Sequence, residues 1–190
     1  MSNFFAMISR MKYIDRWGLM NNTKTENISE HSLEVAILSH ALVSIANTRC
    51  GCSLDADRAA VIGMFHDASE ILIGDMPTPV KYYNPDIRDA YKAVEKVAEN
   101  KLVGMLPEEL RPLYRPLIAD IDPALAPYVK AADKLSALIK CIEEVRMGNN
   151  EFLKAKASIE EAIAAMKLPA LEIFTSEYLP AYYLTLDELG

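Results

Sequence analysis

Cysteine is scarce in this sequence of 190 residues, and the arrangement of its few copies excludes two kinds of site. The three cysteines, Cys50, Cys52 and Cys141, are odd in number and never show the Cys-x-x-Cys spacing. Disulfide frameworks pair an even set of cysteines, and thiolate zinc sites use closely spaced pairs. The sequence therefore predicts reduced thiols, as in a cytoplasmic protein.

Basic blocks and long apolar runs are missing as well. Lysine and arginine total 20 against 27 acidic residues, for a net charge of −7, and no five basic residues are consecutive. Such a chain has no electrostatic footprint for a nucleic-acid polymer or an anionic membrane. The segment MSNFFAMISRMKYIDRW reverses the order of a secretory signal, and no run approaches the roughly 18 apolar residues of a membrane span. We therefore expect a cytoplasmic protein that binds neither a nucleic-acid polymer nor a membrane.

Convincing strand patterns are also absent, whereas apolar residues recur at helical spacing along most of the chain. The predicted fold class is all-α, as a compact helical bundle. A length of 190 residues with 51% apolar and 25% charged residues suits a single domain, residues 1–190, with a continuous core. The expected helices cover approximately residues 3–16, 29–46, 55–74, 85–104, 122–148, 151–167 and 169 onward.

Local signals set the expected ends of these helices. Ser29, Asp55, Asn84 and Asp122 are candidate N-caps, and proline follows Asn84 and Asp122 directly. Three prolines restrict residues 107–116 to short turns, and three more stiffen the loop over residues 74–85. A stiff loop beside a charged helix end is a suitable wall for a ligand.

The stretch VIGMFHDASEILIGD is apolar enough to be core, yet it carries His66 and Asp67 side by side and Glu70 one turn later. Such groups are costly to bury without partners, and a divalent metal would supply one. Adjacent helical side chains diverge by about 100°, so further ligands must come from other helices. His31 and Asp133, each in a helical context, are the candidates. Imidazole and carboxylate together suit Mn, Co, Fe, Ni or Zn.

Glu70 can lie on the same helix face as the metal ligands, because it follows His66 by four residues and Asp67 by three. A metal lowers the pKa of a coordinated water, and a neighbouring carboxylate can then accept or return a proton. The pattern thus favours a catalytic site. His40 is interpreted as an ordinary helix residue.

Plainer interpretations exist for each of these residues. A lone His66 would more often be a core or surface histidine, and Glu70 alone could be a solvated charge at a helix end. Asp75 could cap its loop. Arg16 and Trp17 could be a helix-terminal cation and a core aromatic, or a phosphate fork beside a base-stacking ring, and the residues alone favour the former.

Three short motifs, SEHS, FHDASE and AADKLSALIK, resemble those of the HD-domain metal-dependent phosphohydrolases, whose H…HD…D pattern falls here on His31, His66, Asp67 and Asp133. The longer segments RWGLMNNTKTENISEHSLEVA, MFHDASEILIGDMPTPVKYYN and GNNEF resemble the bacterial 5′-deoxynucleotidase branch of that family. This likeness covers nearly the whole chain and is far more specific than an HD dipeptide.

The resemblance implies an all-helical HD-domain bundle that acts as a homodimeric phosphomonoesterase on deoxyribonucleoside 5′-monophosphates. It implies a divalent metal, cobalt or manganese first, with zinc, nickel, iron and copper as alternatives. By matched position it assigns the metal to His31, His66, Asp67 and Asp133, acid–base catalysis to Glu70, phosphate orientation to Arg16, and substrate contacts to Trp17, Asp75, Met76, Pro77 and Thr78 together with Arg16, His31 and Asp133.

A physical account agrees with this substrate class. Stacking on a ring is independent of the base, which would make the enzyme broad over bases. A carboxylate such as Asp75 could bind the sugar 3′-hydroxyl and exclude a ribose 2′-hydroxyl by occupying its space. The alternatives are another HD-type activity, a triphosphohydrolase or a phosphodiesterase, and a non-catalytic helical module that a metal staples together.

Overall fold

The regular structure is helical over the residues that the computed structural model describes, which are 2–81 and 83–190. No β-strand occurs over these ranges, where an isolated bridge joins Asp15 to Asn27. The prediction of an all-α fold is therefore confirmed. In chain order the elements are α1 (Phe4–Ile8), the 3₁₀ helix η1 (Ser9–Tyr13), α2 (Ile28–Arg49), α3 (Ala56–Phe65), α4 (Glu70–Ile73), α5 (Thr78–Lys81), α6 (Pro85–Gly104), η2 (Glu108–Leu110), α7 (Arg111–Ile118), α8 (Ala126–Arg146), η3 (Asn150–Phe152), α9 (Leu153–Ala164), α10 (Pro169–Glu177), η4 (Leu179–Tyr183) and α11 (Leu186–Leu189).

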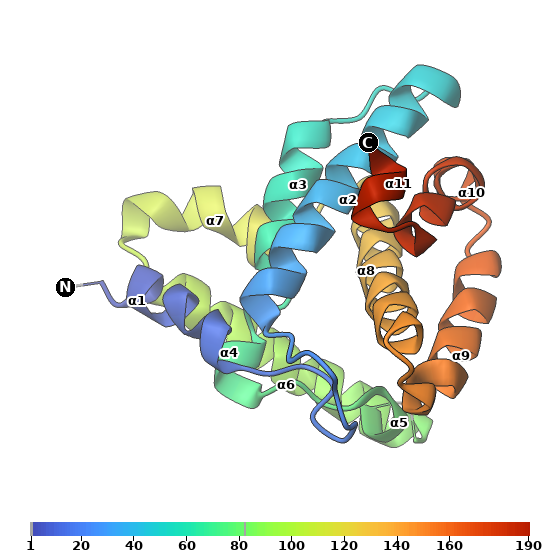
Figure 1. Cartoon of the computed structure of the whole chain (residues 1–190). Coiled ribbons are helices and arrows are strands. Elements are labelled where there is room, and N and C mark those ends of the chain that lie inside the picture. Colours follow the sequence, from blue (N-terminus) through green and yellow to red (C-terminus); the bar gives the residue numbers. More distant parts are fainter. Residues whose placement is uncertain (1, 82) are drawn as a thin grey trace.

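Helices α2, α3 and α8 pack against one another at the centre of the molecule (Figure 1). α9 lies along α8, and α10 contacts α2. The facing sides bury a hydrophobic cluster in which Leu42, Ile62, Leu135 and Ile139 are at most 2% exposed. This cluster fixes the three elements that carry the histidine and aspartate candidates.

A second hydrophobic cluster lies between α1, α6 and α7. Phe4, Leu102, Leu106 and Ile118 belong to it, and so does the fully buried Ala68 from the turn after α3. The chain therefore leaves the central cluster along α3 and enters the second cluster within one turn. The organisation as a single domain over residues 1–190 stays a prediction.

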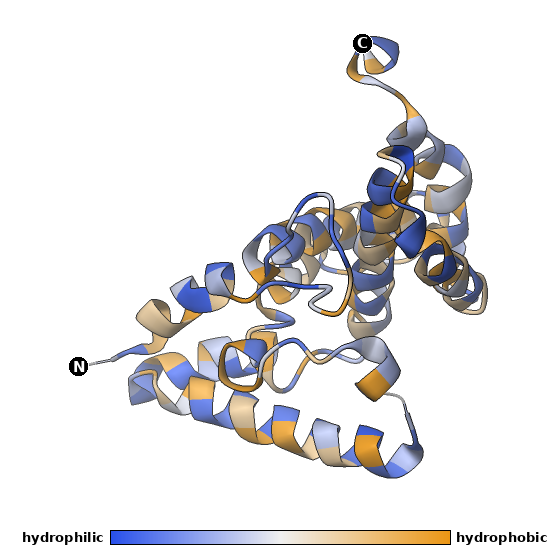
Figure 2. Ribbon diagram, turned by 60° about the horizontal axis from the view of Figure 1, so that its bottom comes forward, coloured by the Kyte–Doolittle hydropathy of each residue, from blue (hydrophilic) through white to orange (hydrophobic). Residues whose placement is uncertain are grey.

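Apolar and polar residues are interspersed along the long helices (Figure 2). In α6 the buried residues Tyr91, Ala98 and Leu102 recur at helical spacing, which is the pattern of a helix with one face on a core. Over the described part of the chain, no helix combines the length and apolar character needed to cross a membrane.

Two of the predicted N-caps are present. The Asp55 side chain accepts a hydrogen bond from the backbone N–H of Arg58 at 2.8 Å, and Asn84 accepts one from the N–H of Ile87 at 2.8 Å. Pro85 then occupies the first position of α6, where its missing N–H costs nothing. These boundaries follow from local chemistry alone.

The predicted cap at Ser29 is wrong, because Asn27 caps α2 instead. Its side chain accepts hydrogen bonds from the N–H groups of Ser29 and Glu30, and the Glu30 side chain returns one to the N–H of Asn27. This reciprocal capping box satisfies more of the free N–H groups at the helix start than Ser29 alone could.

Other predicted boundaries fail where turns replace helix. The first helical segment ends at Tyr13, so Arg16 lies outside it, and the helix expected over residues 55–74 breaks after Phe65. α8 begins at Ala126 rather than near 122, because the Asp122 side chain and carbonyl hold a turn ahead of it. Conversely, residues 111–118 form α7 despite two prolines, one of which lies in its first turn.

Candidate metal centre and substrate site

His66 and Asp67 lie in the turn between α3 and α4 rather than in a continuous helix. The N–H of Ala68 bonds the carbonyl of Phe65 at 3.0 Å, and the N–H of Glu70 bonds the carbonyl of Asp67 at 3.0 Å, both across three residues. This tighter winding departs from the 100° step of an α-helix. As a result, the Asp67 Oδ2 lies 3.0 Å from the His66 Nε2, and both side chains face one centre.

The remaining two predicted ligands reach the same centre from other helices. His31, in the first turn of α2, places its Nε2 3.2 Å from the Asp133 Oδ1 of α8 and 3.4 Å from the Asp67 Oδ2. Ligand atoms of His31, His66 and Asp133 all lie within 4.8 Å of one another. His31 and Asp133, more than 100 positions apart in the sequence, therefore meet as predicted. Their role as metal ligands stays a prediction.

Hydrogen bonds on the far ring nitrogens determine which atom each histidine presents to the centre. The Ser136 hydroxyl donates to the Glu34 carboxylate at 2.6 Å, so at 2.9 Å it accepts from the Nδ1–H of His31. The Nδ1–H of His66 donates to the carbonyl of Gly63 at 2.8 Å. In the neutral ring each Nε2 is then the nitrogen with the lone pair, which is the form that binds a metal.

Both Nε2 atoms are buried and lack a hydrogen-bond partner among the residues that the structure describes. Buried polar atoms without a hydrogen-bond partner are rare, and two imidazole nitrogens of this kind that face carboxylates form a donor set suited to a cation. The chemistry of this donor set fits a divalent metal held by imidazole and carboxylate. The two buried Nε2 atoms thus support a metal site independently of the sequence pattern.

The charges at the centre are arranged to stabilise a cation. Burial lowers the pKa of His31, but its contacts with the Asp133 and Asp67 carboxylates outweigh this and raise it to about 9. Burial raises the pKa of Asp67, yet the charge of His66 and the contact with His31 lower it well below its ordinary value. The pKa of Asp133 is likewise lowered by His31 in spite of burial. Both carboxylates are therefore ionised at neutral pH.

Glu70 begins α4 and is only 7% exposed, with its Oε2 buried and unpartnered among the described residues. Burial is the main cause that raises the pKa of Glu70, to about 9, and the nearby charges of Asp67 and Asp75 add to it. A carboxylic acid with this pKa holds its proton at neutral pH and can donate it. The interpretation of Glu70 as a solvated helix-end charge is wrong.

Arg16 lies outside any helix, in a bend directly after the bridge residue Asp15, so its interpretation as a helix-terminal cation is also wrong. Its backbone N–H bonds the carbonyl of Glu26 at 2.9 Å. The guanidinium places Nε 3.0 Å from the Glu26 Oε2 and Nη1 3.4 Å from the Asp67 Oδ2. This fork therefore borders the centre and can contact an anion there.

Trp17 is held in a strained backbone conformation beside Arg16. Its φ of +61° lies in the left-handed region, which costs a bulky residue about 1–2 kcal/mol. The indole Nε1–H donates to the Glu26 Oε2 at 2.9 Å, and the ring lies 5.3 Å from that of Phe152. Backbone strain of this kind persists where the surroundings fix it, often at functional sites.

Asp75 follows Gly74, whose φ of +77° ends α4 and redirects the chain. Burial raises the pKa of Asp75, and the charge of Arg16 opposes that effect, so the two side chains share one electrostatic environment. Met76 and Pro77 are partly buried and Thr78 is exposed at the start of α5. Their contact with substrate, like that of Asp75, stays a prediction.

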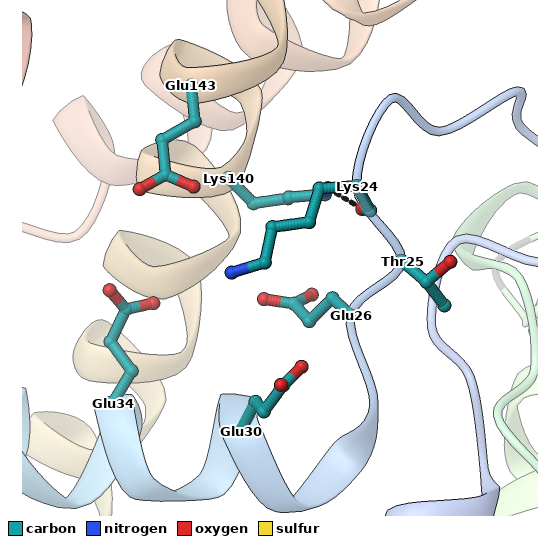
Figure 3. Close-up of a pocket in the computed structure, with 7 residues that line it drawn as sticks. All are labelled: Lys24, Thr25, Glu26, Glu30, Glu34, Lys140 and Glu143. Atoms are coloured by element: carbon teal, nitrogen blue, oxygen red, sulfur yellow. Dashed lines mark hydrogen bonds between the residues drawn. The ribbon is translucent and has the colours of Figure 1, made fainter.

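Several residues near the site had not been singled out in the sequence. Ser136 lies three residues after Asp133 and Glu34 three after His31, so the helical period could have pointed to both. Glu26 lies in a polar segment without periodicity, and nothing in the sequence distinguishes it. Glu26 and Glu34 line one pocket together with Lys24, Thr25, Glu30, Lys140 and Glu143 (Figure 3).

His40, in contrast, lies on the outer side of α2 with its side chain half exposed. Its Nε2 is 3.4 Å from a carboxylate oxygen of Asp57, which is itself almost fully exposed. The prediction that His40 takes no part in the metal centre agrees with this position.

Known proteins are similar to this chain over all the residues of the candidate site. A family model described as 5′-deoxynucleotidase YfbR-like matches residues 3–182. The 5′-deoxynucleotidase YfbR of Shigella dysenteriae serotype 1 is 50% identical, covering 100% of this chain and 96% of that protein. The protein of the same name from Escherichia coli strain ATCC 8739 is 49% identical with the same coverage.

Solved structures show the same fold at lower sequence identity. The HD-domain phosphohydrolase of Listeria innocua has a TM-score of 0.83 at 22% identity, covering 95% of this chain and 88% of that one. A cyanophage S-2L HD phosphohydrolase, bound to dA and one catalytic Zn²⁺, has a TM-score of 0.62 at 19% identity, covering 95% and 96%. The prediction of an HD-domain helical bundle is thereby confirmed.

Proposed function

The chain belongs to the YfbR-like 5′-deoxynucleotidase family and is itself a 5′-deoxynucleotidase, and we propose that it hydrolyses its substrates at the centre formed by His31, His66, Asp67 and Asp133. The observation that supports this location is the pair of buried, unpartnered Nε2 atoms facing two ionised carboxylates. The substrates are deoxyribonucleoside 5′-monophosphates, and the products are deoxyribonucleosides and phosphate.

The four residues would hold one divalent metal, with cobalt or manganese as our first proposal and zinc, nickel, iron or copper as alternatives. When bound, such an ion stabilises charge on phosphate oxygens and increases the acidity of a nucleophilic water. The choice among these metals rests on the permissive chemistry of imidazole and carboxylate, which does not select one of them.

The chain's own residues would perform the other steps. Arg16 would contact the phosphate oxygens through its guanidinium, neutralising charge that develops during transfer. Glu70, protonated at neutral pH, would donate its proton to the 5′ oxygen of the leaving deoxyribonucleoside. Positioning by Arg16 and proton donation by Glu70 together fit hydrolysis of a phosphomonoester.

The remaining proposed contacts explain the choice of substrate. Trp17 would offer a flat ring to the base, which accepts any base because every base has a π face. Asp75 would bind the 3′-hydroxyl and occupy the space beside C2′, so that ribonucleotides are rejected by exclusion. Met76, Pro77 and Thr78 would complete the wall on this side. We further propose a homodimer in the cytoplasm, testable by light scattering and cell fractionation.

Phosphate release from matched pairs tests this function. Protein treated with chelator is assayed on dAMP and AMP, and on dTMP and UMP, with Co²⁺, Mn²⁺, Mg²⁺ or no metal. We expect phosphate release that depends on the added metal and occurs only with the deoxyribonucleotide of each pair. Equal release from both members would contradict the exclusion of ribose by Asp75. No phosphate release with any metal, together with hydrolysis of triphosphates or cyclic nucleotides in a separate product analysis, would favour another HD-type activity.

A further inference from the structure

One oxygen atom of Glu26 accepts hydrogen bonds from two neighbouring residues of the site. The Oε2 lies 3.0 Å from the Nε of Arg16 and 2.9 Å from the Nε1 of Trp17. The side chains involved are largely buried, with 12% exposure for Arg16 and 14% for Glu26. Bonds of this kind to a charged acceptor are stronger than neutral ones, so Glu26 orients both donors.

The backbone fixes Glu26 opposite this pair. The N–H of Arg16 bonds the carbonyl of Glu26 at 2.9 Å, and the N–H of Ile28 bonds the carbonyl of Ile14 at 2.9 Å. The segment before α2 thus runs antiparallel to the segment that carries Arg16 and Trp17. This pairing fixes the backbone position from which the Glu26 side chain reaches both donors.

Helix α8 anchors the same segment from the other side. The Nζ of Lys140 donates to the carbonyl of Lys24, and Glu144 accepts from the N–H of Thr23 at 2.9 Å and of Lys24 at 3.2 Å. Figure 3 shows Glu26 projecting from this anchored loop into the pocket that it shares with Glu34 and Glu143. The backbone that carries Glu26 is therefore held in place by hydrogen bonds to α8, as a positioning residue requires.

The bond to Glu26 determines which N–H groups of the Arg16 guanidinium can still donate to a phosphate. Its Nε is taken by Glu26 and its Nη1 approaches Asp67, whereas Nη2 has no hydrogen-bond partner within the described residues. A guanidinium fixed at Nε presents its outer N–H groups in a defined plane. The orientation of the phosphate-facing group is thus set by the same oxygen that sets the indole plane.

We propose that Glu26 is a positioning residue that couples the phosphate contact of Arg16 to the base contact of Trp17. The inference rests on the proposed function of these two residues. Because the carboxylate is shared, a change at Trp17 shifts Glu26 and thereby Arg16. Binding energy from the base then improves the alignment of the phosphate and contributes to kcat as well as to KM.

Trp17 is the single tryptophan of the chain, so its fluorescence reports on this site without engineering. Three variants are compared: Glu26→Ala, which removes the acceptor, Glu26→Gln, which keeps an acceptor oxygen, and Glu143→Ala. Glu143 is a matched control, because it is an exposed glutamate of the same pocket with no contact to Arg16 or Trp17 within the described residues. Tryptophan emission, acrylamide quenching and the Kd of inorganic phosphate are measured on metal-loaded protein.

We expect Glu26→Ala to shift the emission to longer wavelength, increase quenching and weaken phosphate binding about 10-fold, the loss typical of a charged hydrogen bond. Glu26→Gln should restore much of both properties, and Glu143→Ala should change neither. Altered fluorescence with unchanged phosphate affinity, or the reverse, would overturn the coupling.

Trp17→Phe provides a second test that leaves Glu26 intact. Inorganic phosphate carries no base, so the loss of base stacking cannot itself change its binding, whereas the shared carboxylate connects Trp17 to Arg16. We expect the Kd of phosphate to rise several-fold, and an unchanged Kd would overturn the proposal even if Glu26→Ala failed to fold. Neither readout requires turnover, so failure of the deoxynucleotidase function and failure of the coupling are distinguishable.

Discussion

His31 and His66 present the same ring atom, Nε2, to the candidate metal centre because a hydrogen bond occupies Nδ1 in each. For His66 the acceptor is the backbone carbonyl of Gly63 in the preceding helix α3, which no substitution of a side chain can remove. For His31 it is the Ser136 hydroxyl, whose proton is held by Glu34. The orientation of one ligand is therefore sensitive to side chains outside the centre.

Ser136→Ala should weaken metal binding, because His31 would lose the acceptor that holds its tautomer and ring plane. Removal of such an outer partner typically costs about 10–100-fold in metal affinity. Competition with a chelating dye measures the affinity directly. Ser39→Ala is the control, since Ser39 is a buried serine on α2 whose hydroxyl has no partner among the described residues. Equal affinities of the Ser136 variant and wild type would contradict this role.

Glu70→Gln should lower kcat by about 10²–10⁴-fold, the usual contribution of a general acid or base, while metal content stays constant. Glutamine keeps the shape of the side chain but has no acidic proton to donate. Glu99→Gln is a matched control, because Glu99 also has a raised pKa, caused mainly by burial, but lies on α6, where its Oε2 is 3.4 Å from the Nζ of Lys96. Retained turnover in the Glu70 variant, measured with dAMP, would reject its role as an acid.

At the scale of elements, the break between α3 and α4 is the feature that creates the site. Ile62 belongs to the central cluster and Ala68 to the second, so the chain must change direction between them. α3 also lies unusually close to α2, because a Cβ at Gly63 would meet the Cα of Ala36 at 2.8 Å and its N at 2.9 Å. Packing, rather than local preference, sets the position of His66.

Features that depend on local chemistry could be predicted from the sequence, whereas features that depend on packing could not. The caps at Asp55 and Asn84 act within a few residues, so local chemistry was sufficient to identify them. The break after Phe65 lies within a continuous apolar pattern and depends on two separate cores, which no local window contains. The ligand candidates were found because histidine is rare and a known pattern matched, whereas Glu26 acts through a fold-dependent contact with Arg16.

Gly63→Ala should therefore lower the free energy of unfolding by about 1–3 kcal/mol, the usual cost of overpacking, because α2 and α3 must separate. It should also weaken metal binding, since the Gly63 carbonyl holds His66. Urea unfolding and a metal titration measure the two effects. Gly104→Ala is the control, because apart from its chain neighbours and the backbone of its own helix no described atom would lie within 4 Å of the added Cβ. Similar results for the two variants would show that the close approach is unimportant.

At the scale of the whole molecule, one buried carboxylate connects α8 to segments far away in sequence. Glu144 is fully buried and pairs with Lys140, which is itself 4% exposed. It also accepts from the N–H groups of Thr23 and Lys24 and, at 2.8 Å, from the Nδ2 of Asn149. Together with Lys140, whose Nζ donates to the carbonyl of Lys24, Glu144 thereby ties the loop between Trp17 and α2 to the central helices.

Glu144→Gln should destabilise the protein at neutral pH by about 3 kcal/mol, because it leaves the buried Lys140 without an opposite charge. Burial raises the pKa of Glu144, but its hydrogen bonds from Lys140, Thr23 and Asn149 lower it from an ordinary 4.5 to about 2. The unfolded chain therefore takes up this proton first as the pH falls. The stabilisation by Glu144 is complete above pH 4.5 and disappears toward pH 2.

Urea unfolding of wild type and Glu144→Gln at a series of pH values, with chelator present throughout, measures this difference. The gap between the two proteins should be constant from pH 7 to about 5 and close as the pH falls further, since both then carry a neutral side chain at this position. Glu143→Gln, a change at the adjacent exposed residue, should produce only a small gap. A gap for Glu144→Gln that persists to the lowest pH would instead mean that side-chain geometry, and not charge, ties the loop to α8.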